Sequence, residues 1–255
     1  MVRMTGKLLL LFFLTTVALN CATVDGDFCE PRLLDMAQST VDDQYLSCTE
    51  RMMANVTDPG TGLLWAELKA DPSFQAMWEQ MEQCANGTES LTKHHAVALA
   101  LIAAWNRTFP DAFDRDVEAL GPSSAVYRDY FPSKALHFLL TDAVRRLRVR
   151  DGRCRTVYGV SKDLLALDKP GSEVRLGQFF HAFSSPRVEW FDLTIKSCHA
   201  AILPQSPCAT KWWDVLVPPY EKFRVVAVKK LCRGRHLYLE SSGVHSNLEC
   251  ALFPG

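Results

Sequence analysis

A carboxylate stands at the start of a short apolar run in the second half of the chain. Asp214 opens the predicted strand Asp214–Val217, two residues after Trp212 and ahead of two prolines. A carboxylate fixed beside a reacting centre can stabilise positive charge that develops during bond cleavage. Trp212 can stack on an arginine side chain, but we interpret it as an aromatic strand residue that packs. Asp214 is therefore the first candidate for a catalytic group.

Other patterns that carry chemistry are incomplete in this chain. The segment from Gly159 to Asp163 lacks the second glycine of a Gly-x-Ser-x-Gly nucleophile elbow. Neither Cys-x-x-Cys nor His-Glu-x-x-His occurs, so we expect no metal site. We interpret His94-His95 as a solvated pair at the start of a helix, and His137 and His199 as core or near-core residues.

Charge and the chain ends indicate the compartment. The 255 residues carry a formal net charge of -1, and Arg145–Arg150, the densest basic run, is interpreted as a solvated helix end, so we expect no nucleic-acid partner. Residues 1–22 predict a secretory signal peptide, because their apolar run is shorter than the roughly 20 residues of a membrane span. The last residues, 249–255, lack the hydrophobic tail of a lipid-anchor signal. We expect a secreted, extracellular protein with no membrane span and one domain over residues 23–255.

The cysteines and the sequons agree with that prediction. Nine cysteines are present, and removal of Cys21 leaves eight that can pair in an oxidising compartment. Three Asn-x-Thr sequons predict glycosylation at Asn55, Asn86 and Asn106.

The predicted elements change from helical to β-rich near residue 155. Helical periodicity begins at Asp71-Pro72, at Thr92 and at Ser133. The strands expected afterwards are Arg155–Tyr158, Glu173–Leu176, Val188–Lys196, Asp214–Val217, Phe223–Val228 and His236–Leu239. Helices followed by strands indicate an α+β domain with mostly antiparallel sheets.

Several segments resemble the vertebrate ecto-mono-ADP-ribosyltransferases, in that family's order. The residues that carry the resemblance span nearly all of the predicted mature chain: Asp42–Cys48, Lys134–Thr141, Gly152–Tyr158, Val174–Phe179 and Trp212–Phe223. The last segment is similar to the family's Glu-x-Glu, Val-Leu-Ile-Pro-Pro and aromatic-Glu-x-Phe sequence.

The resemblance implies a fold, a reaction and two disulfides. The implied fold is an N-terminal helical part packed on a split β-core. The implied reaction is transfer of ADP-ribose from NAD, as substrate, to arginine of a protein acceptor, by a protein that we expect to be a monomer. The implied disulfides are Cys48–Cys250 and Cys154–Cys198, which leave Cys29, Cys84, Cys208 and Cys232 without a partner derived from the family.

The residues at the family's site positions differ from the family's pattern. Gly159 either replaces the motif Arg that helps hold the NAD phosphates or marks its deletion, and Arg155 is roughly 13 Å away along a strand. His181 stands in the place of the motif Ser, with Ser184 and Ser185 just beyond. Trp212 takes the place of the Glu on the acceptor side. Asp214 takes the place of the catalytic Glu, with a side chain shorter by about 1.5 Å.

These differences leave alternative functions open. One is the arginine transferase of the family, with reduced activity; a weak NAD glycohydrolase that uses Asp214 is another. The competing class is a pseudoenzyme that binds an extracellular protein. Gly159 and Gln178 lie where we expect the dinucleotide cleft, and loss of one charge-assisted contact predicts weak or absent NAD binding at neutral pH. The sequence further predicts that Gly159→Arg improves NAD binding.

Overall fold

The structure is a computed structural model that describes residues 32–104, 108–151, 153–160, 164–166, 169–186, 191–208, 213–231 and 234–253. The predicted signal peptide, Trp212, Asn106, Cys29 and Cys232 lie outside the described residues. Among the described residues, no helix is both long enough and apolar enough to cross a membrane.

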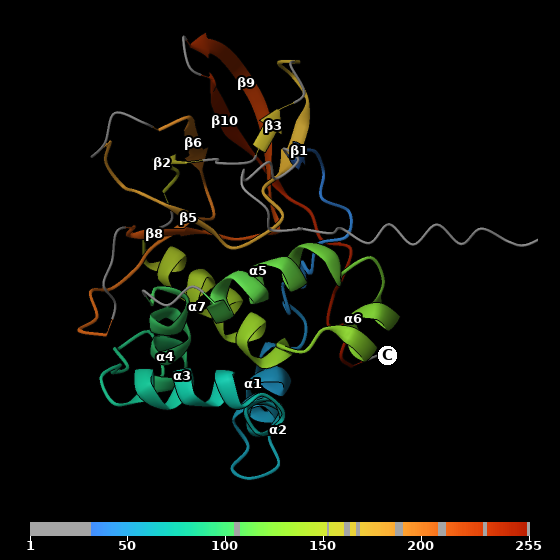
Figure 1. The fold of residues 1–255 in the computed structure, drawn as a ribbon, viewed down its shortest axis with the longest axis vertical. Coiled ribbons are helices and arrows are strands. Elements are labelled where there is room, and N and C mark those ends of the chain that lie inside the picture. Colours follow the sequence, from blue (N-terminus) through green and yellow to red (C-terminus); the bar gives the residue numbers. More distant parts are fainter. Residues whose placement is uncertain are drawn as a thin grey trace, which may run out of the picture.

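Helices fill the first half of the described chain and pack together in the lower half of Figure 1. Their bounds are α1 Thr49–Thr57, α2 Leu63–Ala70, α3 Pro72–Glu82, α4 Lys93–Ile102, α5 Thr108–Ala119, α6 Ser124–Tyr130 and α7 Lys134–Asp151.

The predicted helix starts are confirmed, and their caps explain them. The Asp71 carboxylate accepts hydrogen bonds from the backbone N–H groups of Ser73 and Phe74, and Pro72 occupies the first helical position of α3. Thr92 caps α4 through the backbone N–H of His95. Helices α1, α2, α5 and α6 were not predicted.

Strands follow the helices and form three small sheets. Their bounds are β1 Arg32–Leu34, β2 Arg155–Gly159, β3 Leu164–Ala166, β4 Glu173–Arg175, β5 Phe180–Ala182, β6 Leu193–Ser197, β7 Ala201–Ile202, β8 Val215–Val217, β9 Glu221–Leu231 and β10 Gly234–Val244. The largest sheet has the order β2-β6-β10-β9-β4, the next has the order β5-β8-β7, and β1 pairs with β3. Neighbouring strands are antiparallel except in the pairs β6–β10 and β1–β3, so the predicted α+β class with mostly antiparallel sheets is confirmed.

The three-stranded sheet lies between the helices and the five-stranded sheet (Figure 1). All three residues of its strand β8 are buried. Since successive side chains of a strand point to opposite faces, β8 is covered on both faces. Leu216 joins the core formed with the helices, whereas Val215 and Val217 join the core of the five-stranded sheet. The backbone that carries the candidate site is therefore fixed from both sides.

A clamp of buried carboxylates joins the beginning and the end of the described chain. Asp42 binds Arg175 at 2.6 Å, with both side chains fully buried, and accepts from the backbone N–H groups of Asn247 and Leu248. The adjacent Asp43 accepts three more backbone hydrogen bonds, from Tyr45, Cys250 and Ala251. We call Asp42, Asp43 and Arg175 the terminal clamp.

Three disulfides reinforce this framework. Cys48–Cys250 lies at the terminal clamp, and Cys154–Cys198 links the residues that flank β2 and β6. These are the two pairs that the resemblance implies. A third disulfide, Cys84–Cys208, ties the connection between α3 and α4 to the segment before β8, and sequence reasoning gave no partner for either cysteine.

One prediction about surface charge was wrong, and a second omitted an ion pair. His95 is fully buried, accepts from the Thr92 backbone N–H through Nδ1, and lies 3.1 Å from Asp142 through Nε2. Arg145 and Arg146 each contact the Asp142 carboxylate at 2.5 Å, so the start of the basic run pairs within the protein. The missed signal was Asp142 itself, which lies three and four residues before these arginines on the same helical face.

Candidate functional site

Three strands bring the candidate residues together. Strand β5, which carries His181, pairs antiparallel with β8, and Asp214 immediately precedes β8. Just after β5, Phe183 exchanges two backbone hydrogen bonds with Tyr158 of β2. Gly159, His181 and Asp214 therefore gather at the place where the two larger sheets meet.

Asp214 is held by one residue through both of its carboxylate oxygens. The backbone N–H of Ser184 donates to Oδ1 at 2.8 Å, and the Ser184 hydroxyl donates to Oδ2 at 2.6 Å. The sequence placed Ser184 just beyond the motif position, and the register of β5 against β8 carries it to the carboxylate. Asp214 is half-buried, so its carboxylate is positioned and remains partly open to solvent.

An aromatic stack involves the residue directly before Asp214. The His181 imidazole packs face to face on the Trp213 indole, with ring centroids 3.9 Å apart and ring planes 7° apart. Trp213 comes directly before Asp214, whereas Trp212, the residue expected at the acceptor side, lies outside the described residues. Sequence reasoning did not single out Trp213, because its contact with His181 depends on strand pairing that spacing along the chain does not reveal.

Gly159 occupies a position where a side chain does not fit. A Cβ on this residue would lie 2.5 Å from Cε1 and 2.6 Å from Cζ of the Phe180 ring, which is only 6% exposed. The direction of that Cβ points into the core of the five-stranded sheet. The expectation that Gly159→Arg improves NAD binding is therefore revised: the Arg side chain would meet Phe180 before it reached solvent.

The other residues proposed to shape a dinucleotide cleft have different surroundings. Gln178 is half-buried in the turn between β4 and β5, next to Gly177, whose φ of 75° lies in the left-handed region. Its neighbour Phe179 is buried against His137 in the core of the helices. The turn thus leaves the Gln178 side chain as the part of this segment that reaches toward the surface.

A buried carboxylate anchors the strand that follows the site. Glu221 accepts hydrogen bonds from the hydroxyls of Ser197 and Ser241 and from the backbone N–H groups of Cys198 and His199. Burial raises the pKa of Glu221 above its ordinary value. This residue is fully buried, so we assign it to positioning β9 against β6 and β10.

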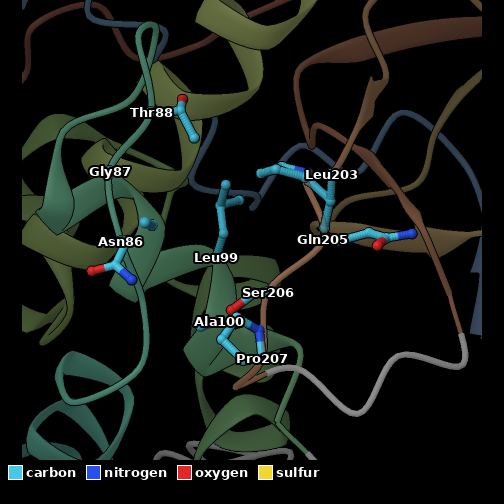
Figure 2. A pocket seen from close by; sticks show the side chains of 11 residues that line it. Asn86, Gly87, Thr88, Leu99, Ala100, Leu203, Gln205, Ser206 and Pro207 are labelled. Carbon is cyan, nitrogen blue, oxygen red and sulfur yellow. The ribbon is translucent and has the colours of Figure 1, made fainter.

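A cavity adjoins the segment that leads to Asp214. It has a volume of about 270 Å³ and lies between helix α4, the segment Asn86–Thr88 and the segment Leu203–Pro207 (Figure 2). Leu203 forms part of its wall and also donates its backbone N–H to the Asp214 carbonyl at 2.9 Å. Among the described residues, no group of three or more His, Cys, Asp or Glu side chains could hold a metal ion.

The glycosylation candidates that can be placed are both at the surface. Asn55 is exposed on α1, and Asn86 is exposed at the rim of the cavity in Figure 2. Glycosylation at these positions stays a prediction.

The fold and the site together define an α+β domain with a carboxylate at the junction of two sheets. Residues 34–247 match the family model described as NAD:arginine ADP-ribosyltransferase, so the chain belongs to this family.

Similar proteins belong to the same family by name. The chain is 31% identical to mouse GPI-linked NAD(P)(+)--arginine ADP-ribosyltransferase 1, over 88% of this chain and 74% of the relative. It is 29% identical to chicken NAD(P)(+)--arginine ADP-ribosyltransferase 1, over 94% of this chain and 79% of the relative.

Solved structures show the same fold. The eukaryotic mono-ADP-ribosyltransferase ART2.2, in a mutant form in complex with NADH, matches with a TM-score of 0.67 and 22% sequence identity. The match covers 86% of this chain and 99% of that one.

Proposed function

We propose that this chain is a secreted member of the family that has lost efficient arginine ADP-ribosylation and acts as an extracellular protein-binding module. The observation that carries the proposal is the set of side chains around Asp214. Where an arginine transferase of this family has two Glu, a Ser and an Arg, this chain has Trp212, Asp214, His181 and Gly159.

The first supporting argument concerns the NAD phosphates. A guanidinium binds phosphate oxygens through paired charge-assisted hydrogen bonds, which a glycine cannot supply. The crowding against Phe180 also favours the interpretation that the motif Arg is deleted and that Gly159 is a framework glycine. NAD binding is therefore expected to be weak.

The second argument concerns the nicotinamide half of the cleft. His181, which stands where the resemblance expects a small Ser, stacks on Trp213, the residue before Asp214. Because the rings stack at 3.9 Å, no third ring fits between them. If nicotinamide occupied the space between these residues, it would have to displace the stack, which supports weakened binding of this half of NAD.

The third argument concerns the arginine acceptor. Trp212 has neither a negative charge nor a proton acceptor, so it does not activate a guanidinium as a Glu does. It can hold an arginine of a protein partner by stacking. This difference favours binding of a protein over modification of it.

One observation favours a second candidate, a slow NAD glycohydrolase. Ser184 binds both oxygens of Asp214 and fixes this partly exposed carboxylate just before the start of β8. A fixed carboxylate is the group needed to stabilise positive charge on ribose while nicotinamide leaves and water attacks. The shorter Asp side chain makes this slow, because a misplacement of about 1 Å costs on the order of 100-fold in rate.

The extracellular location is supported by two kinds of evidence. Three disulfides suit an oxidising compartment. The relatives include GPI-linked enzymes and the protein named ecto-ADP-ribosyltransferase 4. Whether this chain is secreted or anchored is tested by following it in the medium of expressing cells, where we expect the soluble glycosylated form.

The function is tested by incubating purified protein with labelled NAD and following nicotinamide release and protein labelling separately. We expect no arginine labelling above background, and at most slow nicotinamide release that disappears in Asp214→Ala. The matched control is Asp58→Ala, which removes an exposed carboxylate of the helical half. Robust arginine labelling that is lost in Asp214→Ala and kept in Asp58→Ala would overturn the proposal.

A further inference from the structure

The outer end of the β9–β10 hairpin carries an excess of positive charge. Strand β9 and strand β10 extend past the rest of the five-stranded sheet, as the top of Figure 1 shows. From Val225 to Leu239 the sequence contains no acidic residue and four cationic ones, Lys229, Lys230, Arg233 and Arg235. We call the described residues Lys229, Lys230, Arg235 and His236 the hairpin end.

The strand register places two cations opposite each other at the hairpin end, because Lys230 is the cross-strand partner of Arg235. Lys229 is the cross-strand partner of His236. Residues paired in this way have Cβ atoms about 4.5–5.5 Å apart, and like charges there are destabilising. Because side chains alternate between the two faces of a strand, Lys229 and Lys230 point to opposite faces. The hairpin end is thus basic on both sides.

The base of the same hairpin is different. There Lys222 pairs with Glu173 at 2.9 Å, and Lys196 of β6 pairs with Glu240 at 2.7 Å. Within the described parts of the chain, no such ion pair involves Lys229 or Lys230, and both are exposed. The protein neutralises its cations at the base of the hairpin and leaves these two lysines available at the end.

Rings lie beside these cations. The Lys229 ammonium lies 4.9 Å from the centroid of the half-exposed Tyr238 ring, and His236 packs on the same ring at 4.7 Å. The Thr194 hydroxyl lies 2.8 Å from Nε2 of His236 and helps to orient that ring. A cation next to an aromatic face matches a sugar ring that carries an anionic substituent.

We propose that the hairpin end binds a sulfated polysaccharide outside the cell. Short segments rich in Lys and Arg are a recognised signal for such anionic polymers. A chain with closely spaced sulfate groups can contact both faces of a narrow hairpin, which a small anion cannot. The near-neutral chain, with a net charge of -1, concentrates positive charge here. The site is separate from Asp214, so the proposal stands whether or not the protein transfers ADP-ribose.

The test is retention of the full-length secreted protein on immobilised heparin, followed by titration with heparin in solution. We expect retention at physiological ionic strength and elution by added salt, because screening weakens exposed charge contacts. The double variant K229E/K230E should bind at least about 25-fold more weakly, at roughly fivefold for each lost cation. The control K69E/K93E makes the same charge change on exposed residues of α2 and α4 and should keep its affinity.

Three results would overturn the proposal. One is no retention of the unmodified protein at physiological ionic strength. Another is an equal loss in both double variants, which would indicate a net-charge effect. The third is binding to vesicles with anionic lipids but not to heparin, which would assign the hairpin end to a membrane. If the unmodified protein does not bind heparin and K229E/K230E self-associates, the two lysines serve only to prevent edge-to-edge pairing of β9 with another chain.

Discussion

The terminal clamp and the Asp214 site both depend on carboxylates, and the two use them in opposite ways. Asp42 and Asp43 are fully buried, and their oxygens are occupied by Arg175 and by backbone N–H groups. Asp214 is half-buried and is bound at its carboxylate by Ser184. The clamp residues lie in segments that resemble the family's sequence, whereas the site positions depart from its motifs in our sequence comparison. Under the proposed function, the family framework persists around a site whose chemistry has changed.

The largest effect is expected from opening the clamp. Asp42→Asn removes the charge that neutralises Arg175 in a site where neither side chain is exposed. Breaking a buried ion pair leaves one charge unpaired, so we expect a loss of about 3–5 kcal/mol in the free energy of unfolding. Urea denaturation measures this loss, with Asp129→Asn at an exposed position as the control. Equal stability of the two variants would show that the clamp is not what holds the framework together.

A buried carboxyl of the helical half makes the framework sensitive to pH. Burial raises the pKa of Glu67 from 4.5 to about 8, and both of its oxygens lie 3.1 Å from the backbone N of Ala135 in α7. Because the folded pKa is the higher one, its contribution is complete below about pH 4.5 and is lost as pH rises through about 8. We expect this group to lower stability by on the order of 3 kcal/mol between pH 5 and pH 8.5.

Denaturation at several pH values compares the unmodified protein with Glu67→Gln, which keeps an acceptor for Ala135 and cannot ionise. The variant should lose stability less steeply as pH rises. An identical slope in the two proteins would contradict the assigned role of Glu67.

A smaller loss is expected at the junction of framework and site. Gly159→Ala places a Cβ against the buried Phe180 ring, and overpacking of this kind costs about 1–3 kcal/mol. Gly159→Arg should cost more and should not restore NAD binding. In a Phe180→Leu background the cost of Gly159→Ala should fall, because the two residues share one space. Additive losses in that double-mutant cycle would show that Phe180 does not limit the site.

The smallest effect on stability is expected from removing the Ser184 hydroxyl that binds Asp214. Ser184→Ala removes one hydroxyl from a partly exposed pair, so the free energy of unfolding should change by about 0.5–1.5 kcal/mol. Any nicotinamide release should fall more clearly, because the carboxylate loses its orientation. Ser39→Ala, at an exposed position, is the control. A change in unfolding free energy as large as that of Asp42→Asn would place Asp214 in the framework and not in a functional site.

Sequence predicted the framework well because its signals are local or belong to recognisable segments. Asp71-Pro72 and Thr92 act as helix caps through residues two or three positions away. The short helices α1 and α6 were missed, because a few apolar positions in seven to nine residues do not define a periodicity. The disulfide Cys84–Cys208 was missed because it joins segments that meet only after the helices and sheets have packed.

The sequence named candidate site residues, and the structure shows which of them lie near one another; their functional roles stay a prediction. Gly159, His181 and Asp214 do come together, but Ser184 and Trp213 became visible only with the pairing of β5 and β8. A shift of one residue in strand register sends each side chain to the opposite face. Spacing along the chain could not decide between a missing serine and a displaced one. The crowding at Gly159 likewise depends on Phe180, a residue 21 positions away.

The central claim is that the framework of an NAD-dependent transferase remains while its affinity for NAD is reduced. Calorimetric titration of the unmodified protein with NAD at pH 7.4 tests this most directly. The account predicts weak or undetectable binding, roughly tenfold to a hundredfold weaker than for a relative that has the motif Arg. Tight NAD binding by the unmodified protein would contradict it, and would mean that another group holds the phosphates in place of the motif Arg.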